Sequence, residues 1–187
     1  IIQPTGMNCT AGGMKLITKI TMTSRKERRV DCNAWNLTVL FSSSMSRKKI
    51  LILCTGNSCR SQMAHGFLQS FDRQLEVRSA GTHPAYAVNP KAVKVMQEAG
   101  IDISMHVPVH ISEYLGQEWD YVITVCDQAN ETCPAFFGKV RNRIHMGVED
   151  PSHLAGTEEK ILREFRRVRD EIKHTFYKFY QEHIKSH

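Results

Sequence analysis

The sequence predicts an α/β fold in which a parallel β-sheet carries helices on both faces. From residue 49 onward, short apolar stretches alternate with longer amphipathic stretches that have helical spacing. The stretches at residues 50–53 and 120–125 have the length and composition of strands, and the first suits burial on both faces. A cysteine follows each of these two stretches. Because ligands bind beyond the carboxyl ends of parallel strands, we expect the functional site at this edge of the sheet.

The first two predicted strands flank a helix. The strand at residues 50–53 runs directly into a short loop, and a helix begins at Ser61. Apolar residues recur along this helix at helical spacing, namely Met63, Ala64, Phe67, Leu68 and Phe71. The second strand covers residues 75–80 and ends at Gly81. This order is typical of a βαβ unit.

The rest of the chain continues the alternation. A second helix is predicted to begin at Pro90, because Asn89 can cap it, and to end at Gly100. Two further strands are predicted at residues 120–125 and 140–146. A long helix follows at residues 157–184. Its apolar stripe is assigned to the core rather than to a cofactor site, and consists of Ile161, Phe165, Val168, Ile172, Phe176 and Phe179.

The length of 187 residues allows one ordinary domain. We predict that this domain covers residues 45–187, with Met45 as the natural start. Residues 1–44 are predicted to be a non-domain extension, either poorly ordered or upstream sequence, because their apolar stretches are short and irregular. No signal-peptide apolar region follows their basic cluster.

The distribution of charge argues against a nucleic-acid partner. The net charge is +6, but residues 1–44 contain six Lys and Arg and only two Asp and Glu, which leaves a net charge of +2 for the remainder. No apolar run approaches the roughly 20 residues that span a bilayer, so no membrane partner is predicted. Six cysteines in a chain that can build its own core favour thiol chemistry in a reducing compartment, and we predict a cytoplasmic protein.

Residues 54–61 form a candidate oxyanion site with the sequence Cys-Thr-Gly-Asn-Ser-Cys-Arg-Ser. A loop between a strand and a helix N-terminus directs backbone N–H groups and the helix dipole toward an anion. The same field and the Ser61 hydroxyl are expected to stabilise the thiolate of Cys54, the predicted nucleophile. Arg60 offers a planar, charged fork for a tetrahedral oxyanion. The predicted oxyanion-binding residues are Thr55, Gly56, Asn57, Ser58, Cys59, Arg60 and Ser61.

This loop resembles the signature loop of the low-molecular-weight protein tyrosine phosphatase superfamily. It is more closely similar to that of the thioredoxin-coupled arsenate reductases, which share the fold. The resemblance covers about residues 48–182. It implies a three-layer α/β/α arrangement with a four-stranded parallel sheet, like that of the low-molecular-weight phosphatases.

The resemblance also assigns a general acid. Asp150 matches the Asp-Pro acid of the superfamily, which protonates the departing oxygen as sulfur attacks. Pro151 restricts the backbone that presents it. Phosphatases of this family usually have tyrosines just after Asp-Pro, whereas this chain has Ser152 and His153, which favours a reductase.

Two further cysteines distinguish the branches of the superfamily. The stretch 122–134 resembles the redox segment of the arsenate reductases, and the phosphatases lack its cysteine pair, Cys126 and Cys133. Seven residues apart on an intact helix, their Cα atoms would be roughly 10 Å apart, beyond the about 7 Å that a disulfide tolerates. Pairing would then require this segment to unwind. The alternatives are two unrelated buried thiols or, with less support from the spacing, a zinc site.

The predicted function is the reduction of arsenate to arsenite through a three-cysteine relay, in arsenic detoxification. Arsenate would bind in the loop with Arg60, Cys54 would attack arsenic, and Cys126 and then Cys133 would carry the oxidation outward. The resemblance implies thioredoxin as the reductant. No cofactor or metal is predicted, because thiols supply the electrons. Two alternatives remain: a low-molecular-weight protein tyrosine phosphatase, which needs only Cys54, Arg60 and Asp150, and a non-catalytic oxyanion-binding or metal-sensing protein.

Some reductases of this type hold a potassium ion near the loop. This chain has His65 and Val109 where those proteins have acids, although Asn57 and Ser79 remain. We therefore do not predict this cation site.

Overall fold

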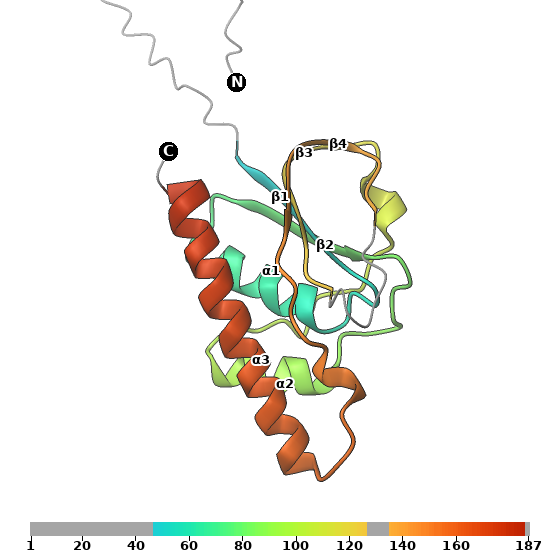
Figure 1. Ribbon diagram of the computed structural model, residues 1–187, viewed down its shortest axis with the longest axis vertical. Coiled ribbons are helices and arrows are strands. Elements are labelled where there is room, and N and C mark those ends of the chain that lie inside the picture. Colours follow the sequence, from blue (N-terminus) through green and yellow to red (C-terminus); the bar gives the residue numbers. More distant parts are fainter. Residues whose placement is uncertain (1–46, 127–134, 186–187) are drawn as a thin grey trace, which may run out of the picture. The chain divides into compact units, whose positions relative to one another are not determined.

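A four-stranded parallel sheet forms the centre of the domain, as predicted (Figure 1). The computed structural model describes residues 47–126 and 135–185, so the predictions for residues 1–44 lie outside the described residues. The strand order is β2-β1-β3-β4. The strands are β1 (Lys49–Cys54), β2 (Glu76–Gly81), β3 (Glu118–Thr124) and β4 (Lys139–His145).

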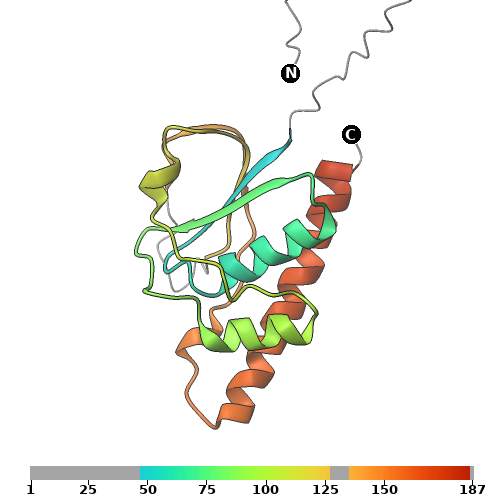
Figure 2. The same ribbon diagram turned by 180° about the vertical axis from the view of Figure 1, so that it is seen from behind.

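Within the described residues, three α-helices lie together on one side of this sheet, as the two opposite views show (Figures 1 and 2). The sequence predicted helices on both faces, but the only helix that the described ranges place on the other face is the short 3₁₀ helix η1 (Ile111–Tyr114). The three α-helices are α1 (Arg60–Phe71), α2 (Pro90–Glu98) and α3 (Glu158–Phe179). A π-helical segment, η3 (Tyr180–Lys185), continues α3. Two short 3₁₀ helices complete the order, namely η1 (Ile111–Tyr114) and η2 (Pro151–His153). None of the helices in the described ranges combines the length and apolar character needed to cross a membrane.

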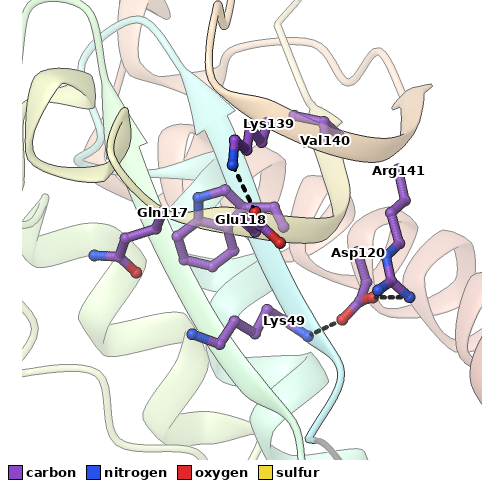
Figure 3. Close-up of a pocket in the computed structure, with 8 residues that line it drawn as sticks. Lys49, Gln117, Glu118, Asp120, Lys139, Val140 and Arg141 are labelled. Atoms are coloured by element: carbon purple, nitrogen blue, oxygen red, sulfur yellow. Dashed lines mark hydrogen bonds and ion pairs between the residues drawn. The ribbon is translucent and has the colours of Figure 1, made fainter.

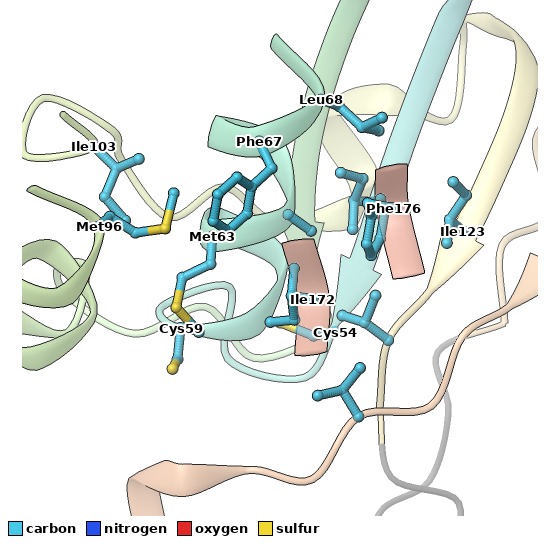
Figure 4. Packing of buried hydrophobic residues seen from close by; sticks show 14 of the residues in the cluster. Cys54, Cys59, Met63, Phe67, Leu68, Met96, Ile103, Ile123, Ile172 and Phe176 are labelled. Atoms are coloured by element: carbon cyan, nitrogen blue, oxygen red, sulfur yellow. The ribbon is translucent and has the colours of Figure 1, made fainter. Parts of the chain in front are cut away.

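The alternation of β1 divides the core between the two faces of the sheet. Ile50 and Ile52 point to the α-helical face, where they join the buried apolar residues of α1, α2 and α3 (Figure 4). Leu51 and Leu53 point to the other face and pack in a smaller cluster that includes Trp119. Within the described residues, this second face is covered by η1 and the segment around Phe136. Burial on both faces explains why β1 is apolar after its first residue, Lys49.

The predicted boundaries hold to within about two residues for most elements. Asn89 caps α2 by accepting the Lys91 N–H at 2.9 Å, and Thr157 caps α3 by accepting the Lys160 N–H at 3.3 Å. The strand β3 begins earlier than predicted, because Glu118 pairs with Lys139 of β4. The last turns of the predicted helix 157–184 widen into η3.

Gly81 at the end of β2 packs closely against the loop after β1. It pairs with Cys54, and a Cβ at this position would collide with the carbonyl oxygen of Thr55 and lie 3.0 Å from the backbone nitrogen of Asn57. We expect Gly81→Ala to lower the free energy of unfolding by about 1–3 kcal/mol, because backbone atoms cannot move aside cheaply. Urea denaturation measures this change.

The matched control is Gly116→Ala, because nothing lies within 4 Å of a Cβ at that position. We expect it to change the free energy of unfolding by no more than about 0.5 kcal/mol. Equal losses in the two variants would show that the contact between Gly81 and the loop has no special weight.

Candidate active site

The loop between β1 and α1 surrounds the thiol of Cys54. Cys54 is the last residue of β1 and is 2% exposed. Its Sγ accepts a hydrogen bond from the Asn57 N–H at 3.1 Å and lies 2.9 Å from the Ser61 Oγ. No side chain caps α1, so no capping side chain occupies the N–H groups of its first turn, which lie at the loop. The strand, loop and uncapped helix N-terminus on which the predicted anion site depends are therefore observed, with Cys54 at the entrance of the loop.

Burial raises the pKa of the Cys54 thiol. The Ser61 hydroxyl, the Arg60 guanidinium and the N–H groups of Asn57 and Ser61 all oppose this rise, because each favours the thiolate. The expectation of a lowered pKa is therefore not met, since loss of solvent outweighs the stabilising groups. The Ser61 hydroxyl and the loop N–H groups were expected to stabilise the thiolate, whereas this effect of Arg60 was not predicted.

Asn57 holds the loop in its unusual shape. Its φ of +45° lies in the left-handed region, which asparagine tolerates better than most residues. The side chain is fully buried and makes three hydrogen bonds. Its Nδ2 donates to the Ser61 Oγ at 2.9 Å, and its Oδ1 accepts from the Val109 N–H at 2.8 Å and from the Gln62 Nε2 at 3.2 Å. Asn57 therefore fixes both the loop backbone and the hydroxyl beside Cys54.

A second segment, residues 82–89, runs alongside the loop and was not identified from the sequence. Three of its N–H groups donate to consecutive parts of the loop: His83 to the Thr55 carbonyl at 2.9 Å, Ala85 to the Gly56 carbonyl at 2.8 Å, and Asn89 to the Ser58 carbonyl at 2.8 Å. These three carbonyls accept hydrogen bonds from the segment 82–89. The N–H groups of the loop therefore remain available to an anion.

Arg60 lies at the start of α1 and is 2% exposed. One terminal nitrogen donates to the Asp150 Oδ2 at 2.7 Å, and the other donates to the backbone carbonyls of Val148 at 3.1 Å and Val125 at 3.5 Å. The guanidinium therefore joins α1 to the segments that follow β3 and β4. It also brings the predicted acid, Asp150, to the same site as Cys54.

Asp150 itself is held at the start of η2. Its Oδ1 accepts the Ser152 N–H at 2.9 Å, and its side chain retains 17% exposure. The predicted loop position after β4 is therefore observed, and Pro151 begins η2 directly behind it. An acid at this position faces the guanidinium and remains in contact with solvent.

Cys59 is buried in the same loop, at 3% exposure. Burial raises the pKa of its thiol strongly, and the negative charge of Asp150 raises it further. Cys59 therefore stays a neutral thiol at ordinary pH, which does not favour it as a nucleophile.

Cys126 lies two residues beyond β3 and is fully buried. The Val125 N–H donates to the Leu53 carbonyl at 2.9 Å, so the chain leading to Cys126 runs beside the end of β1 that carries Cys54. Cys126 is disulfide-bonded, whereas Cys54 and Cys59 are free thiols. Residues 127–134, which include Cys133 and the segment expected to unwind if it is helical, lie outside the described residues.

The residues at the positions of the potassium site, which the sequence does not predict for this chain, contact one another or the loop. The His65 Nδ1 lies 3.4 Å from the Ser79 Oγ, and the Val109 N–H donates to Asn57. Burial lowers the pKa of His65 to about 3, so this side chain is neutral at ordinary pH. Within the described ranges, no group of three or more His, Cys, Asp or Glu side chains is arranged to hold a metal ion.

A surface pocket of about 580 Å³ lies at the opposite end of the sheet (Figure 3). It is lined by the first residues of three strands, Lys49, Glu118 and Lys139, whereas Cys54 ends β1. Its charged groups satisfy one another, as the ion pair of 2.8 Å between Lys139 and Glu118 illustrates. We therefore take the loop around Cys54, and not this pocket, as the candidate active site.

Comparison with known proteins agrees with this geometry. The family model described as low molecular weight phosphotyrosine protein phosphatase matches residues 49–187. An arsenate reductase of Halalkalibacterium halodurans is 47% identical over 129 residues, which cover 68% of this chain and 91% of that protein. The arsenate reductase of Bacillus subtilis is 45% identical over the same shares. A solved arsenate reductase in the phosphate-binding state superposes with a TM-score of 0.60 at 30% identity, covering 71% of this chain and 95% of that one.

Proposed function

Since the chain belongs to the low molecular weight phosphotyrosine protein phosphatase family, we propose that it is the arsenate reductase type of member and reduces arsenate to arsenite with thiols. One observation carries this proposal beyond the fold. A second cysteine, Cys126, lies two residues beyond β3, and β3 pairs with β1, which ends at Cys54. Cys126 is disulfide-bonded, whereas Cys54 is a free thiol. A phosphatase has no use for this second thiol. A relay that passes oxidation outward requires it.

The first step is attack by sulfur on a bound oxyanion. The loop N–H groups and Arg60 hold arsenate, whose charge and tetrahedral shape fit a helix N-terminus. The Cys54 thiolate forms a bond to arsenic(V), and one oxygen leaves as water after Asp150 supplies its proton. Substrate oxygens compete with Asp150 for the Arg60 nitrogen that holds it at 2.7 Å. Binding therefore frees the acid at the moment when it is needed.

The second step moves two electrons from sulfur to arsenic. The Cys126 thiolate attacks the Cys54 sulfur, a disulfide forms between these residues, and the electron pair of the broken sulfur–arsenic bond reduces arsenic(V) to arsenic(III). Arsenite leaves. Cys133 then attacks the Cys126 sulfur, which returns Cys54 as a thiolate and leaves a disulfide between Cys126 and Cys133. The bonded state of Cys126, together with the free thiol of Cys54, supports this end state.

Reduction of the last disulfide completes the cycle. We propose thioredoxin as the dithiol that supplies these two electrons, and the cytoplasm as the reducing compartment in which the thiols persist. The chain itself then needs no flavin, nicotinamide or metal, since every electron passes through sulfur.

The test is a coupled assay with the full chain, thioredoxin, thioredoxin reductase and NADPH. We expect NADPH oxidation that requires arsenate, releases one arsenite for each NADPH, and stops when thioredoxin is omitted. Phosphate in place of arsenate should give no NADPH oxidation, because phosphorus(V) is not reduced by thiols. Hydrolysis of a phosphoester without arsenate-dependent NADPH oxidation would instead identify the chain as a phosphatase.

A further inference from the structure

A continuous path of hydrogen bonds leads from the thiol of Cys54 to a histidine outside the loop. Its inner part runs from Cys54 to Ser61 at 2.9 Å and from Ser61 to the Asn57 Nδ2 at 2.9 Å. Its outer part runs from the Asn57 Oδ1 to the Gln62 Nε2 at 3.2 Å and from the Gln62 Oε1 to the His106 Nδ1 at 2.9 Å. Gln62 is 1% exposed, so these bonds are shielded from solvent over most of the path.

When Cys54 is a thiolate, the donors and acceptors along this path have only one consistent arrangement. The Gln62 Nε2 donates to the Asn57 carbonyl at 3.0 Å as well as to its Oδ1, so the Gln62 Oε1 must accept. His106 therefore carries a proton on Nδ1 and donates it. At the other end, Ser61 accepts from the Asn57 Nδ2, and when Cys54 is a thiolate its sulfur can only accept, so the Ser61 hydroxyl donates to it. In each of the four bonds, the donor lies on the side of His106 and the acceptor lies on the side of Cys54.

His65 holds the histidine at the outer end of the path. The two imidazole rings lie 4.5 Å apart with an angle of 33° between their planes. Burial lowers the pKa of both rings. For His65 the positive charge of His106 and then that of Arg78 lower the pKa further, whereas Asp102 opposes the fall for His106. His106 donates from Nδ1 whether it is neutral in this tautomer or charged, so the path keeps its direction as pH changes.

We propose that His106, packed against His65, is a positioning residue for Cys54, because its Nδ1–H donor orients the four hydrogen bonds that end on the nucleophilic sulfur. Aligned hydrogen bonds polarise one another, and the positive end of this series faces the thiolate. The same series holds Asn57 in the left-handed conformation that shapes the loop. The inference rests on the proposed role of Cys54 as nucleophile, and its test measures the thiol rather than arsenate reduction.

Two substitutions distinguish the effect of the Nδ1–H donor of His106 from the effect of its ring packing against His65. His106→Phe keeps a ring against His65 but removes the donor, whereas His106→Asn places an amide nitrogen near the position of Nδ1. We expect His106→Phe to slow alkylation of Cys54 by iodoacetamide at neutral pH about 3- to 10-fold and to move the midpoint of its pH profile upward. His106→Asn should stay within about twofold of the unmodified chain. Mass spectrometry of the Cys54 peptide, after reduction of the full chain, gives the rate for this thiol alone.

The matched control is His174→Phe, because His174 is exposed on α3 and takes no part in the path. A Cys54 profile that is unchanged in His106→Phe would overturn the proposal, as would equal slowing by His106→Phe and His106→Asn. If His106→Phe fails to fold, long-range ¹H–¹⁵N spectra of the unmodified chain decide the question. They should show the neutral Nδ1–H tautomer of His106, and an Nε2–H tautomer would contradict the direction of the bonds. A failed arsenate assay with the expected alkylation results would disprove the reductase and leave this inference standing.

Discussion

Replacement of Cys126 by serine is expected to abolish steady-state arsenate reduction, with a loss of at least about 10³-fold, the scale seen when a nucleophile is removed. The physical reason is that a hydroxyl cannot attack the Cys54 sulfur as a thiolate does. Binding should persist, because Arg60 and the loop around Cys54 are unchanged. The measurement is arsenate-dependent NADPH oxidation in the coupled assay, together with the mass of the chain after one turnover.

The mass identifies the step that fails. In Cys126→Ser, Cys54 should accumulate as an arsenic adduct or return to the free thiol. The disulfide between Cys54 and Cys126, which the relay forms in the unmodified chain, should be missing. Hydrolysis of a phosphoester should be affected far less, because it requires only Cys54, Arg60 and Asp150. Cys32→Ser is the matched control, since it makes the same chemical change at a cysteine to which no role is assigned. Arsenate reduction that survives Cys126→Ser would disprove the relay.

The parts of the site that the sequence predicted are those determined by neighbours in the chain. The loop at residues 54–60 follows a strand buried on both faces and precedes a helix without a side-chain cap, and both features are local. Asp150 was assigned by family resemblance and not by pattern, because an Asp-Pro pair by itself is commonly a solvated turn. Its contact with Arg60 spans 90 positions and becomes visible only in the fold.

The parts that the sequence did not predict depend on distant contacts. The segment 82–89 supports the loop through backbone N–H groups. Almost every residue type has such a group, so the sequence does not indicate these contacts. His106 lies 44 positions from Gln62, so neither residue suggested the other. The pKa of Cys54 was also misjudged, because the sequence shows which groups favour the thiolate but not how completely the loop excludes solvent. In each case the missing information was the tertiary packing of the loop.

Replacement of Arg60 by lysine is the second prediction with a large expected effect. Arg60 uses two terminal nitrogens in different directions, one toward Asp150 and the other toward the carbonyls of Val148 and Val125. A lysine keeps the charge but has a single ammonium, so it cannot hold the acid and the two backbone segments together. We expect kcat/KM for arsenate to fall about 10²- to 10³-fold, the loss typical of removing one donor to a developing anion.

Arg166 provides the matched control on the same chain. It also makes a bidentate contact, to Glu98 at 2.7 and 2.8 Å, but it lies on the exposed face of α3 away from Cys54. Arg166→Lys makes the same chemical change, and we expect kcat/KM to stay within about twofold, because exposed ion pairs contribute little. If Arg60→Lys also stays within twofold, the buried guanidinium is not part of the oxyanion site. If its loss is large, phosphate should protect Cys54 from alkylation in the unmodified chain and fail to do so in Arg60→Lys, because the same fork holds either tetrahedral oxyanion.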